Sequence, residues 1–278
     1  MGFRLGSVDG RAVLVDGDHV HDVERASAGT VPSEPRLAVA AHRRLHDLAA
    51  NLVGAERDVG ERGRGLGPPV PWPRHVFGVG LNYRTHAAET GMALPEAPLV
   101  FTKFPGCLAG PVGEVALASD TTDYEAELVI VIGAEVKGVA VADAWDAVAG
   151  LMVGQDVSDR GLQNAGDRPQ FSLGKSHDGY GPTGPFVVSP DLLPDRDDLA
   201  IGCTVNGETR QSDRTANLIF SVPELVSYLS GVLTLQPGDL VFTGTPSGVG
   251  LPTRNFLRAG DVVETTIEGL GGLHTRCV

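Results

Sequence analysis

The chain reads DYEAELVIVIG from Asp123 to Gly133, and the two halves of this segment differ in character. The second half, Leu128–Ile132, is a continuous aliphatic run, which is typical of a strand buried on both faces. The first half carries Glu125 and Glu127, whose side chains share one face if both belong to the strand, because side chains alternate along a strand. The segment therefore predicts a central strand with two carboxylates at one end.

A second strand-like segment also contains an acid. The run LMVGQDV, Leu151–Val157, is apolar apart from Gln155 and Asp156. Three carboxylates that lie close together repel one another unless a cation joins them. An all-oxygen set suits a hard divalent cation, with Mg²⁺ first and Mn²⁺ or Ca²⁺ as alternatives. The other interpretation is that these strand ends lie in water, where glutamate side chains are usually found.

His86 and Glu89 stand three positions apart in the segment Asn82–Glu89. If this segment is helical, the two side chains are neighbours on one face of the helix. A carboxylate beside an imidazole orients the ring and raises its basicity, which gives a general base near neutral pH. An exposed helix with an incidental ion pair is the other interpretation of the same spacing.

Composition and charge exclude several classes of protein. The 278 residues include 22 Lys and Arg against 35 Asp and Glu, so the formal net charge is −13. A strongly acidic chain is a poor nucleic-acid binder, because phosphate contact needs a basic surface. The three cysteines, Cys107, Cys203 and Cys277, are too few and too far apart for a disulfide framework and fit a reducing compartment. With no apolar run near the ~20 residues that span a bilayer, and no signal peptide, we expect a cytoplasmic protein without a membrane partner.

The pattern of turns and strands indicates two parts of unequal size. Hairpin turns are expected at Asp9-Gly10 and Asp16-Gly17, and a helix at Glu34–Glu56. The Gly- and Pro-rich stretch Gly60–Pro73 reads as a linker, so we place a boundary near residue 70. The prediction is a small N-terminal α+β domain over residues 1–70, linker included, and a larger domain over residues 71–278.

Short strands dominate the larger part, which favours a mainly β fold with some α over a doubly wound sheet. Helices are expected at Val141–Ala149 and at Ser221–Leu229, and a hairpin turn at Asn206-Gly207. The expected strands are His75–Gly80, Pro98–Lys103, Glu125–Ile132, Leu151–Val157, Phe186–Ser189, Leu199–Val205, Leu240–Thr243, Asp261–Ile267 and Leu273–Val278.

Two glycine-rich segments fail as nucleotide-binding motifs. Gly78-Val79-Gly80 follows a predicted strand, but a dinucleotide fingerprint needs a third glycine at position 83, which is Tyr83. The stretch Gly244–Gly250 has no Gly-Lys-Ser/Thr ending and is not a phosphate-binding loop of the P-loop type. The sequence also contains no nucleophile elbow of a serine hydrolase between a strand and a helix.

In their order along the chain, several segments resemble the fumarylacetoacetate hydrolase family over about residues 72–278. The resemblance implies a mixed β-sandwich roll, usually a homodimer, that acts on small-molecule 2-keto or β-diketo acids. The segments are Gly80-Leu81-Asn82-Tyr83 with His86 and Glu89, Glu125-Ala126-Glu127, Asp156–Gln163, Lys175-Ser176, Val205–Glu208 and Thr243–Gly250.

The resemblance also implies roles for individual residues. Glu125, Glu127 and Asp156 are the implied ligands of Mg²⁺, and His86 with Glu89 is the implied acid/base pair. His177 departs from the family pattern, where an aromatic or apolar residue is expected. It would either make the pocket more polar or point to solvent. Lys175 is implied as a cation near the reacting carbon, and Tyr83, Arg160, Gln163 and Thr245 as contacts to substrate oxygens.

The chemistry expected from these residues starts from chelation of a 2-keto acid, which stabilises an enolate at carbon 3. For a β-diketo acid such as an acylpyruvate or fumarylpyruvate, His86 with Glu89 would activate water for carbon–carbon cleavage, and this hydrolase is the first prediction. The same enolate serves a decarboxylase of oxaloacetate or a tautomerase of a hydroxymuconate-type diacid. A non-catalytic protein that binds a metal or a small acid is the alternative from another class.

Overall fold

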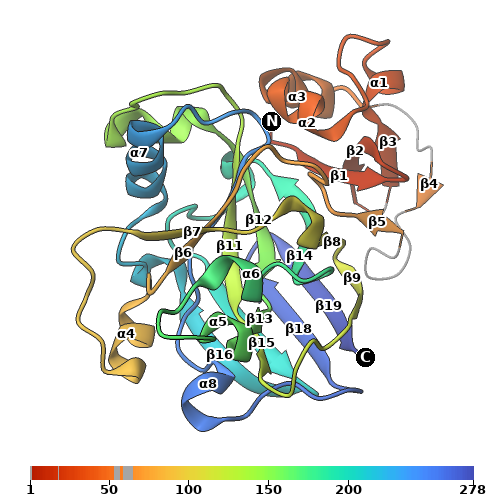
Figure 1. The fold of residues 1–278 in the computed structure, drawn as a ribbon. Coiled ribbons are helices and arrows are strands. Elements are labelled where there is room, and N and C mark those ends of the chain that lie inside the picture. The colour runs from red at the N-terminus through yellow and green to blue at the C-terminus, as the bar shows by residue number, and fades with distance from the viewer. Residues whose placement is uncertain (1, 18, 53–56, 59–64) are drawn as a thin grey trace.

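The computed structural model describes residues 2–17, 19–52, 57–58 and 65–278, and their strands form two large sheets (Figure 1). The larger sheet is mixed and contains twelve strands. Its order is β4 (Arg57–Asp58), β3 (His19–Asp22), β2 (Arg11–Asp16), β1 (Arg4–Val8), β14 (Gly181–Val188), β12 (Val148–Gln155), β11 (Ala126–Ile132), β17 (Leu240–Phe242), β6 (Val76–Gly80) and β7 (Leu99–Thr102), with β5 (Leu66–Gly67) on β1 and β8 (Leu108–Ala109) on β14.

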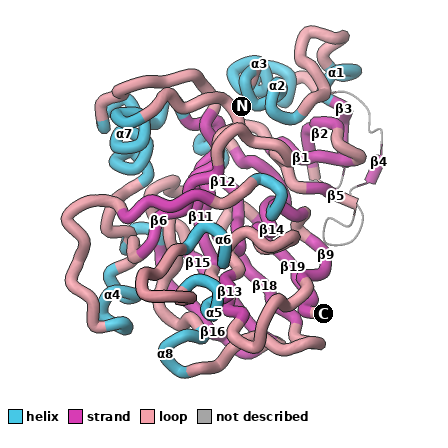
Figure 2. The backbone as a smooth tube through the Cα atoms, viewed as in Figure 1, coloured by secondary structure: helices cyan, strands magenta, loops and turns pink. Residues whose placement is uncertain are grey.

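A five-stranded sheet faces the larger one. A short two-stranded ladder continues the pairing of β11 with β12 beyond the end of these two strands of the larger sheet. The strands occupy the middle of the molecule, and most helices lie at its periphery (Figure 2). The five-stranded sheet has the order β16 (Glu208–Arg214), β15 (Ala200–Val205), β18 (Val262–Ile267), β19 (Gly271–Cys277) and β9 (Val112–Val115), and the short ladder pairs β10 (Thr122–Asp123) with β13 (Ser158–Asp159).

The helices of the described residues are short. None of them combines the length and the hydropathy that a membrane-spanning helix needs. The α-helices are α1 (Val23–Ala26), α2 (Pro35–Ala40), α3 (His42–Ala49), α4 (Arg84–Thr90), α5 (Arg160–Gln163), α6 (Phe171–Gly174), α7 (Val222–Val232) and α8 (Gly250–Thr253), and the 3₁₀ helices are η2 (Pro105–Cys107), η3 (Val141–Ala147), η4 (Pro190–Leu192) and η5 (Thr215–Asn217).

Strand β11 is buried along its whole length because it separates two hydrophobic cores. Leu128 and Ile130 face the core between the two sheets, whereas Val129 and Val131 face a second core, to which Leu45 of α3 contributes. This two-sided burial explains the continuous aliphatic run in the sequence. The expected class, a mainly β mixed sandwich with some α, is confirmed.

The predicted strands are present, and their ends agree within three residues except at the start of β14, which begins at Gly181 and not at Phe186. The turns at Asp9-Gly10 and Asn206-Gly207 are confirmed, each with both residues at positive φ, as the hairpin turn requires. The hairpin expected at Asp16-Gly17 joins β2 to β3, where Asp16 lies opposite His19, and residue 18 lies outside the described residues. The helix expected at Ser221–Leu229 is α7, and Ser221 forms the capping box with Glu224.

Two helix predictions were wrong. The helix expected at Glu34–Glu56 is two helices, because Ala41 leaves helical geometry between α2 and α3, and this bend lets both helices pack on the sheet. Residues 53–56 lie outside the described part. The helix expected at Val141–Ala149 is the 3₁₀ helix η3, which ends at Ala147 because Val148 pairs with Ile132 of β11.

The boundary near residue 70 stays a prediction. The larger sheet continues across it, since β1 pairs with β14 through Arg4–Val188 and Leu5–Val187. Within the expected linker, β5 pairs with β1, while residues 60–64 are outside the described residues. The N-terminal strands therefore extend the sheet that carries the site described below.

Truncation of the central strand should show how much the two cores depend on it. Ile130 is fully buried, so Ile130→Ala should lower the free energy of unfolding by about 2–5 kcal/mol in urea titrations. Val232→Ala, at a site 69% exposed, is the control and should change it by less than about 0.5 kcal/mol. Equal effects of the two variants would contradict the assignment of β11 to the centre of the fold.

Candidate active site

The pairing of β11 with β12 brings distant acids together. Ala126 lies opposite Gln155, and the next pair beyond the strands is Glu125 with Asp156, whose N–H donates to the Glu125 carbonyl oxygen at 2.8 Å. The same register continues into the short ladder, where Asp123 lies opposite Ser158. The carboxylates thus meet because an antiparallel ladder places them across from one another.

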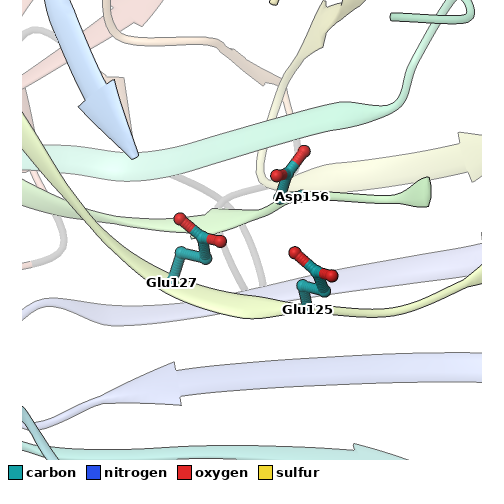
Figure 3. Close-up of side chains that lie close together, drawn as sticks. All are labelled: Glu125, Glu127 and Asp156. Carbon is teal, nitrogen blue, oxygen red and sulfur yellow. The ribbon is translucent and has the colours of Figure 1, made fainter. Parts of the chain in front are cut away.

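Glu125, Glu127 and Asp156 form a buried cluster of carboxylates. Ligand oxygens of the three side chains all lie within 4.8 Å of one another, and each residue is at most 7% exposed. Figure 3 shows Glu125 and Glu127 on one side and Asp156 across from them, with the carboxylates turned toward a common space. Such an arrangement offers only oxygen ligands, which hard divalent cations prefer.

Two of these acids already have cationic partners. Lys175 Nζ lies 2.7 Å from both Glu125 Oε2 and Asp156 Oδ2, and Arg160 Nη2 lies 2.7 Å from Glu125 Oε1. Burial alone would raise the pKa of Glu125, but Lys175 and Arg160 outweigh it and lower the pKa to about 2. Glu125 is therefore ionised at neutral pH.

Glu127 differs from its neighbours. Its carboxylate accepts a hydrogen bond from the Gly244 N–H at 2.8 Å and forms no ion pair with any residue that the structure describes. Burial, followed by repulsion from Asp156 and Glu125, raises its pKa well above the usual range. A divalent cation would relieve this repulsion, so the donor set and its excess negative charge fit a metal ion.

Sequence reasoning missed Lys103, which directly follows β7. Its side chain is fully buried, and Nζ lies 2.7 Å from Asp156 Oδ1, 3.1 Å from the Tyr180 carbonyl oxygen and in contact with the Lys175 carbonyl oxygen. Attraction to Asp156 overcomes burial and raises the pKa of Lys103. A lysine two positions after the apolar run Leu99–Phe101, at the end of the predicted strand, was the available signal, but lysines at strand ends usually lie in solvent.

Asp123 is a second residue that sequence reasoning missed. It is fully buried, and its carboxylate accepts hydrogen bonds from Arg160 Nε at 2.9 Å and from the Gly250 and Leu251 N–H groups at 2.7 and 3.1 Å. Asp123 therefore links Arg160 to the first residues of α8. Its position two residues before Glu125 was the signal in the sequence.

The predicted pair His86 and Glu89 lies on α4, as the spacing indicated. His86 Nδ1 is 3.3 Å from Glu89 Oε2. Glu89 also accepts from the Gly248 N–H at 3.1 and 3.2 Å, and Thr85 Oγ1 donates to Asp213 Oδ2 at 2.6 Å. These contacts attach α4 to the body of the protein with His86 facing the acid cluster across a cavity.

The cavity has a volume of about 260 Å³, slightly below the roughly 300–1,000 Å³ of drug-sized sites, and suits a small metabolite. One end is polar, and the rest of its wall is largely apolar, including Leu99, Phe101 and Phe171. The predicted site residues that line it are His86, Glu125, Glu127, Arg160, Gln163, Lys175 and Thr245.

Two of the predicted substrate contacts, Tyr83 and Thr245, are buried. Tyr83 is fully buried in the core beside the cavity, and its hydroxyl has no hydrogen-bond partner among the described residues; burial raises its pKa. Thr245 Oγ1 donates to the Ala126 carbonyl oxygen at 2.9 Å and accepts from Gln211 Nε2 at 2.8 Å. Their roles toward substrate stay predictions.

His177 does not make the cavity more polar, contrary to the first expectation from sequence. Its ring packs on Tyr180 with centroids 4.8 Å apart, and Nε2 lies 3.4 Å from Asp159 Oδ2, outside the cavity lining. The imidazole turns toward the residue that caps α5, because Asp159 offers it a carboxylate.

Comparison with known proteins gives a match over most of the chain. The family model "Fumarylacetoacetate (FAA) hydrolase C-terminal" matches residues 75–278. A fumarylacetoacetate hydrolase domain-containing protein 2 homolog from Dictyostelium discoideum is 44% identical over 72% of this chain and 70% of its own. The 2,4-didehydro-3-deoxy-L-rhamnonate hydrolase of Sphingomonas sp. is 39% identical over 89% of this chain and 86% of its own.

Solved structures agree over nearly the full length. A protein from Mycobacterium smegmatis is 46% identical, with a TM-score of 0.93 and 99% coverage of both chains. Maleylpyruvate hydrolase from Sphingobium sp. SYK-6, in complex with manganese(II) and pyruvate, is 29% identical, with a TM-score of 0.81 over 99% of this chain and 98% of its own. The 2-hydroxyhepta-2,4-diene-1,7-dioate isomerase of Mycobacterium marinum is 30% identical, with a TM-score of 0.75 over 100% of this chain and 98% of its own.

Replacement of Glu127 should remove metal binding without unfolding the protein. At a free metal concentration of about 100 Kd, Mg²⁺ or Mn²⁺ should stabilise the parent protein by about 2.7 kcal/mol, visible as a rise in Tm. In Glu127→Gln this rise in Tm should vanish. The affinity for the metal should fall by more than the roughly 10–100-fold that is typical when a residue that only contacts a metal ligand is replaced. Glu114→Gln, at an exposed position on β9, is the matched control. Unchanged metal affinity of Glu127→Gln in titration calorimetry would rule out the site.

Proposed function

This chain belongs to the fumarylacetoacetate hydrolase family, and on that premise we propose that it is a magnesium-dependent hydrolase that cleaves a carbon–carbon bond in a β-diketo acid. The family membership makes it an enzyme of a group that includes hydrolases and isomerases. The observation that carries the hydrolase assignment is His86, which contacts Glu89 and lines the same cavity as Glu125 and Glu127. Isomerisation or decarboxylation does not require a group that activates water.

The polar end of the cavity binds the 2-keto acid end of the substrate. Glu125, Glu127 and Asp156 would hold the divalent cation, Mg²⁺ in this proposal and Mn²⁺ or Ca²⁺ as alternatives. When bound, the cation polarises the ketone and favours the enolate form of the keto acid. Arg160 and Gln163 line this end and are the proposed contacts to the substrate carboxylate.

His86 is the proposed general base. Its Nδ1–H donates to Glu89, which fixes the ring and leaves Nε2 as the nitrogen that takes a proton from water. The hydroxide attacks the distal carbonyl carbon, and the bond from that carbon to carbon 3 then breaks. The electron pair passes to carbon 3 as a pyruvate enolate, and the imidazolium returns the proton there. The products are a carboxylic acid and pyruvate.

Lys175 supplies positive charge beside the developing enolate. Lys175 is 2% exposed, and its Nζ is held by Glu125, Asp156 and Ser158, so the charge acts in a partly dry site where it has more effect than in water. Tyr83 and Thr245 complete the proposed contacts to substrate oxygens.

The rival reactions are separable with one substrate panel. Acylpyruvates, oxaloacetate and hydroxymuconates are incubated with the protein and Mg²⁺ or Mn²⁺, and products are identified by mass. Pyruvate and a carboxylic acid from an acylpyruvate support the proposal. If oxaloacetate is the only compound that reacts and it releases carbon dioxide, the protein is a decarboxylase. If only the hydroxymuconates react and they are tautomerised, it is an isomerase. If no compound reacts, it is a binding protein.

Loss of the base should slow hydrolysis without loss of substrate binding. His86→Ala should lower kcat on an acylpyruvate by roughly 10²–10⁴, the usual share of general acid–base catalysis, with KM little changed. The control is His274→Ala. His274 Nδ1 lies 3.2 Å from Glu264 Oε1, which makes a similar pair, but neither residue lines the cavity. Retained cleavage by His86→Ala with metal bound would show that another group activates the water.

We also infer a homodimer, as the resemblance implies, since closed twofold dimers are the commonest soluble oligomers. Light scattering at micromolar protein concentration should give twice the mass of the chain. A monomer at that concentration would contradict this inference.

A further inference from the structure

We infer that the substrate carries one carboxylate only, and that its tail beyond carbon 3 is uncharged and apolar. This inference rests on the proposed function, because it concerns the part of the same cavity that lies beyond the proposed catalytic and metal-binding residues. We call this part the tail cleft and define it by Leu99 and Phe101 of β7 and Phe171 of α6, which lie along β6.

The tail cleft is built on two glycines. The register of β6 with β7 sets Gly78 opposite Phe101 and Gly80 opposite Leu99. A Cβ atom on Gly78 would lie 2.3 Å from the Phe101 ring, and one on Gly80 would lie 3.2 Å from Leu99 and 3.7 Å from Phe171. Only glycine at position 78 leaves room for the aromatic ring to fold over the strand. This close approach accounts for the Gly-x-Gly pattern that failed as a nucleotide-binding motif.

The apolar wall begins directly beside the reacting groups. Lys175 Nζ lies 5.3 Å from the centre of the Phe101 ring, and the rings of Phe101 and Phe171 meet edge to face at 5.7 Å and 79°. A substrate whose keto acid end lies at Lys175 must therefore extend its tail along these rings. Aromatic walls of this kind bind apolar groups.

A second carboxylate would find no available counter-charge there. Among the described residues that line the cavity, the lysine and arginine side chains are Lys175 and Arg160. Both form ion pairs with carboxylates at the polar end, where Arg160 is the proposed contact to the carboxylate of the keto acid end, so neither is left for a carboxylate in the tail. His86 is paired with Glu89, itself an acid. A tail carboxylate that packs against the rings of Phe101 and Phe171 would lose part of its water without gaining a cationic partner, which is unfavourable.

The charges of the buried groups support the same conclusion. When all are ionised, four acids face three cations, so one negative charge is in excess. A divalent cation turns this into one positive charge in excess, which a single substrate carboxylate neutralises; a dioate would restore an imbalance. The groups counted are the carboxylate cluster and the side chains joined to it through ion pairs, each at most 7% exposed: Asp123, Glu125, Glu127, Asp156, Lys103, Arg160 and Lys175.

A series of 2,4-diketo acids tests the tail cleft directly. The value of kcat/KM should rise about fourfold for each methylene added to an alkyl tail, until the cleft is filled. A diketo acid of matched length whose tail ends in a carboxylate should have a kcat/KM at least about 10²-fold lower. Equal or better turnover of the carboxylate-tailed compound would overturn the inference.

A charge introduced into the tail cleft should reverse the preference. Leu99 is 50% exposed, so Leu99→Arg should fold, raise kcat/KM for the carboxylate-tailed compound roughly 10- to 100-fold and lower it for the alkyl tails. Leu173→Arg is the matched control, because Leu173 is 59% exposed on α6 and lies outside the cavity lining. Phe171→Ala should abolish the gain from the longest alkyl tails. No change of preference in either cleft variant would overturn the inference.

Binding measurements separate this inference from the proposed reaction. If no diketo acid is cleaved in the presence of metal, the proposed hydrolase is wrong, but the cleft can still be tested with simple 2-oxo acids. Calorimetry of the metal-loaded protein should then show tighter binding of a 2-oxo acid with an alkyl tail than of a 2-oxodioate of equal length. Equal or tighter binding of the dioate would overturn the inference whichever reaction the enzyme catalyses.

Discussion

The antiparallel ladder between β11 and β12 is the constraint on which the site depends. Ala126 lies opposite Gln155, and the same register continues to Glu125 with Asp156 and to Asp123 with Ser158. A slip by one residue would turn every side chain of β11 to the other face and drive Glu127 into an aliphatic core. Because both faces of β11 are buried, that slip is strongly disfavoured, and the hydrophobic cores thereby fix the spacing of the carboxylates.

The cost of this arrangement is electrostatic. Buried acids are costly unless they are paired, and here Lys103, Lys175 and Arg160 provide most of the pairing. The remaining imbalance is concentrated at Glu127, whose pKa is raised by burial and by its neighbours. The protein thus keeps one unfavourable carboxylate at the position where a cation would make it favourable. This is the usual relation between a binding site and local instability.

The sequence allowed part of this arrangement to be predicted, and physical reasons explain the rest. Acids within or beside aliphatic runs, such as Glu127 and Asp156, are conspicuous because burial of a carboxylate needs a cause. Lys103 was not recognisable, because a lysine after a strand is ordinarily solvated and only the tertiary fold buries it. The bend at Ala41 was missed because it depends on the shape of the sheet beneath α2 and α3, and local helical periodicity carries no information on that shape.

Glu89 has two partners that belong to different parts of the molecule, His86 on its own helix and the Gly248 N–H on the loop before α8. Any displacement of α4 away from that loop breaks the second contact and leaves the carboxylate free to turn away from the imidazole. The contact between α4 and this loop therefore controls how the imidazole of the proposed base is oriented. In the proposed hydrolase, a displaced α4 would leave His86 poorly placed to take a proton from water.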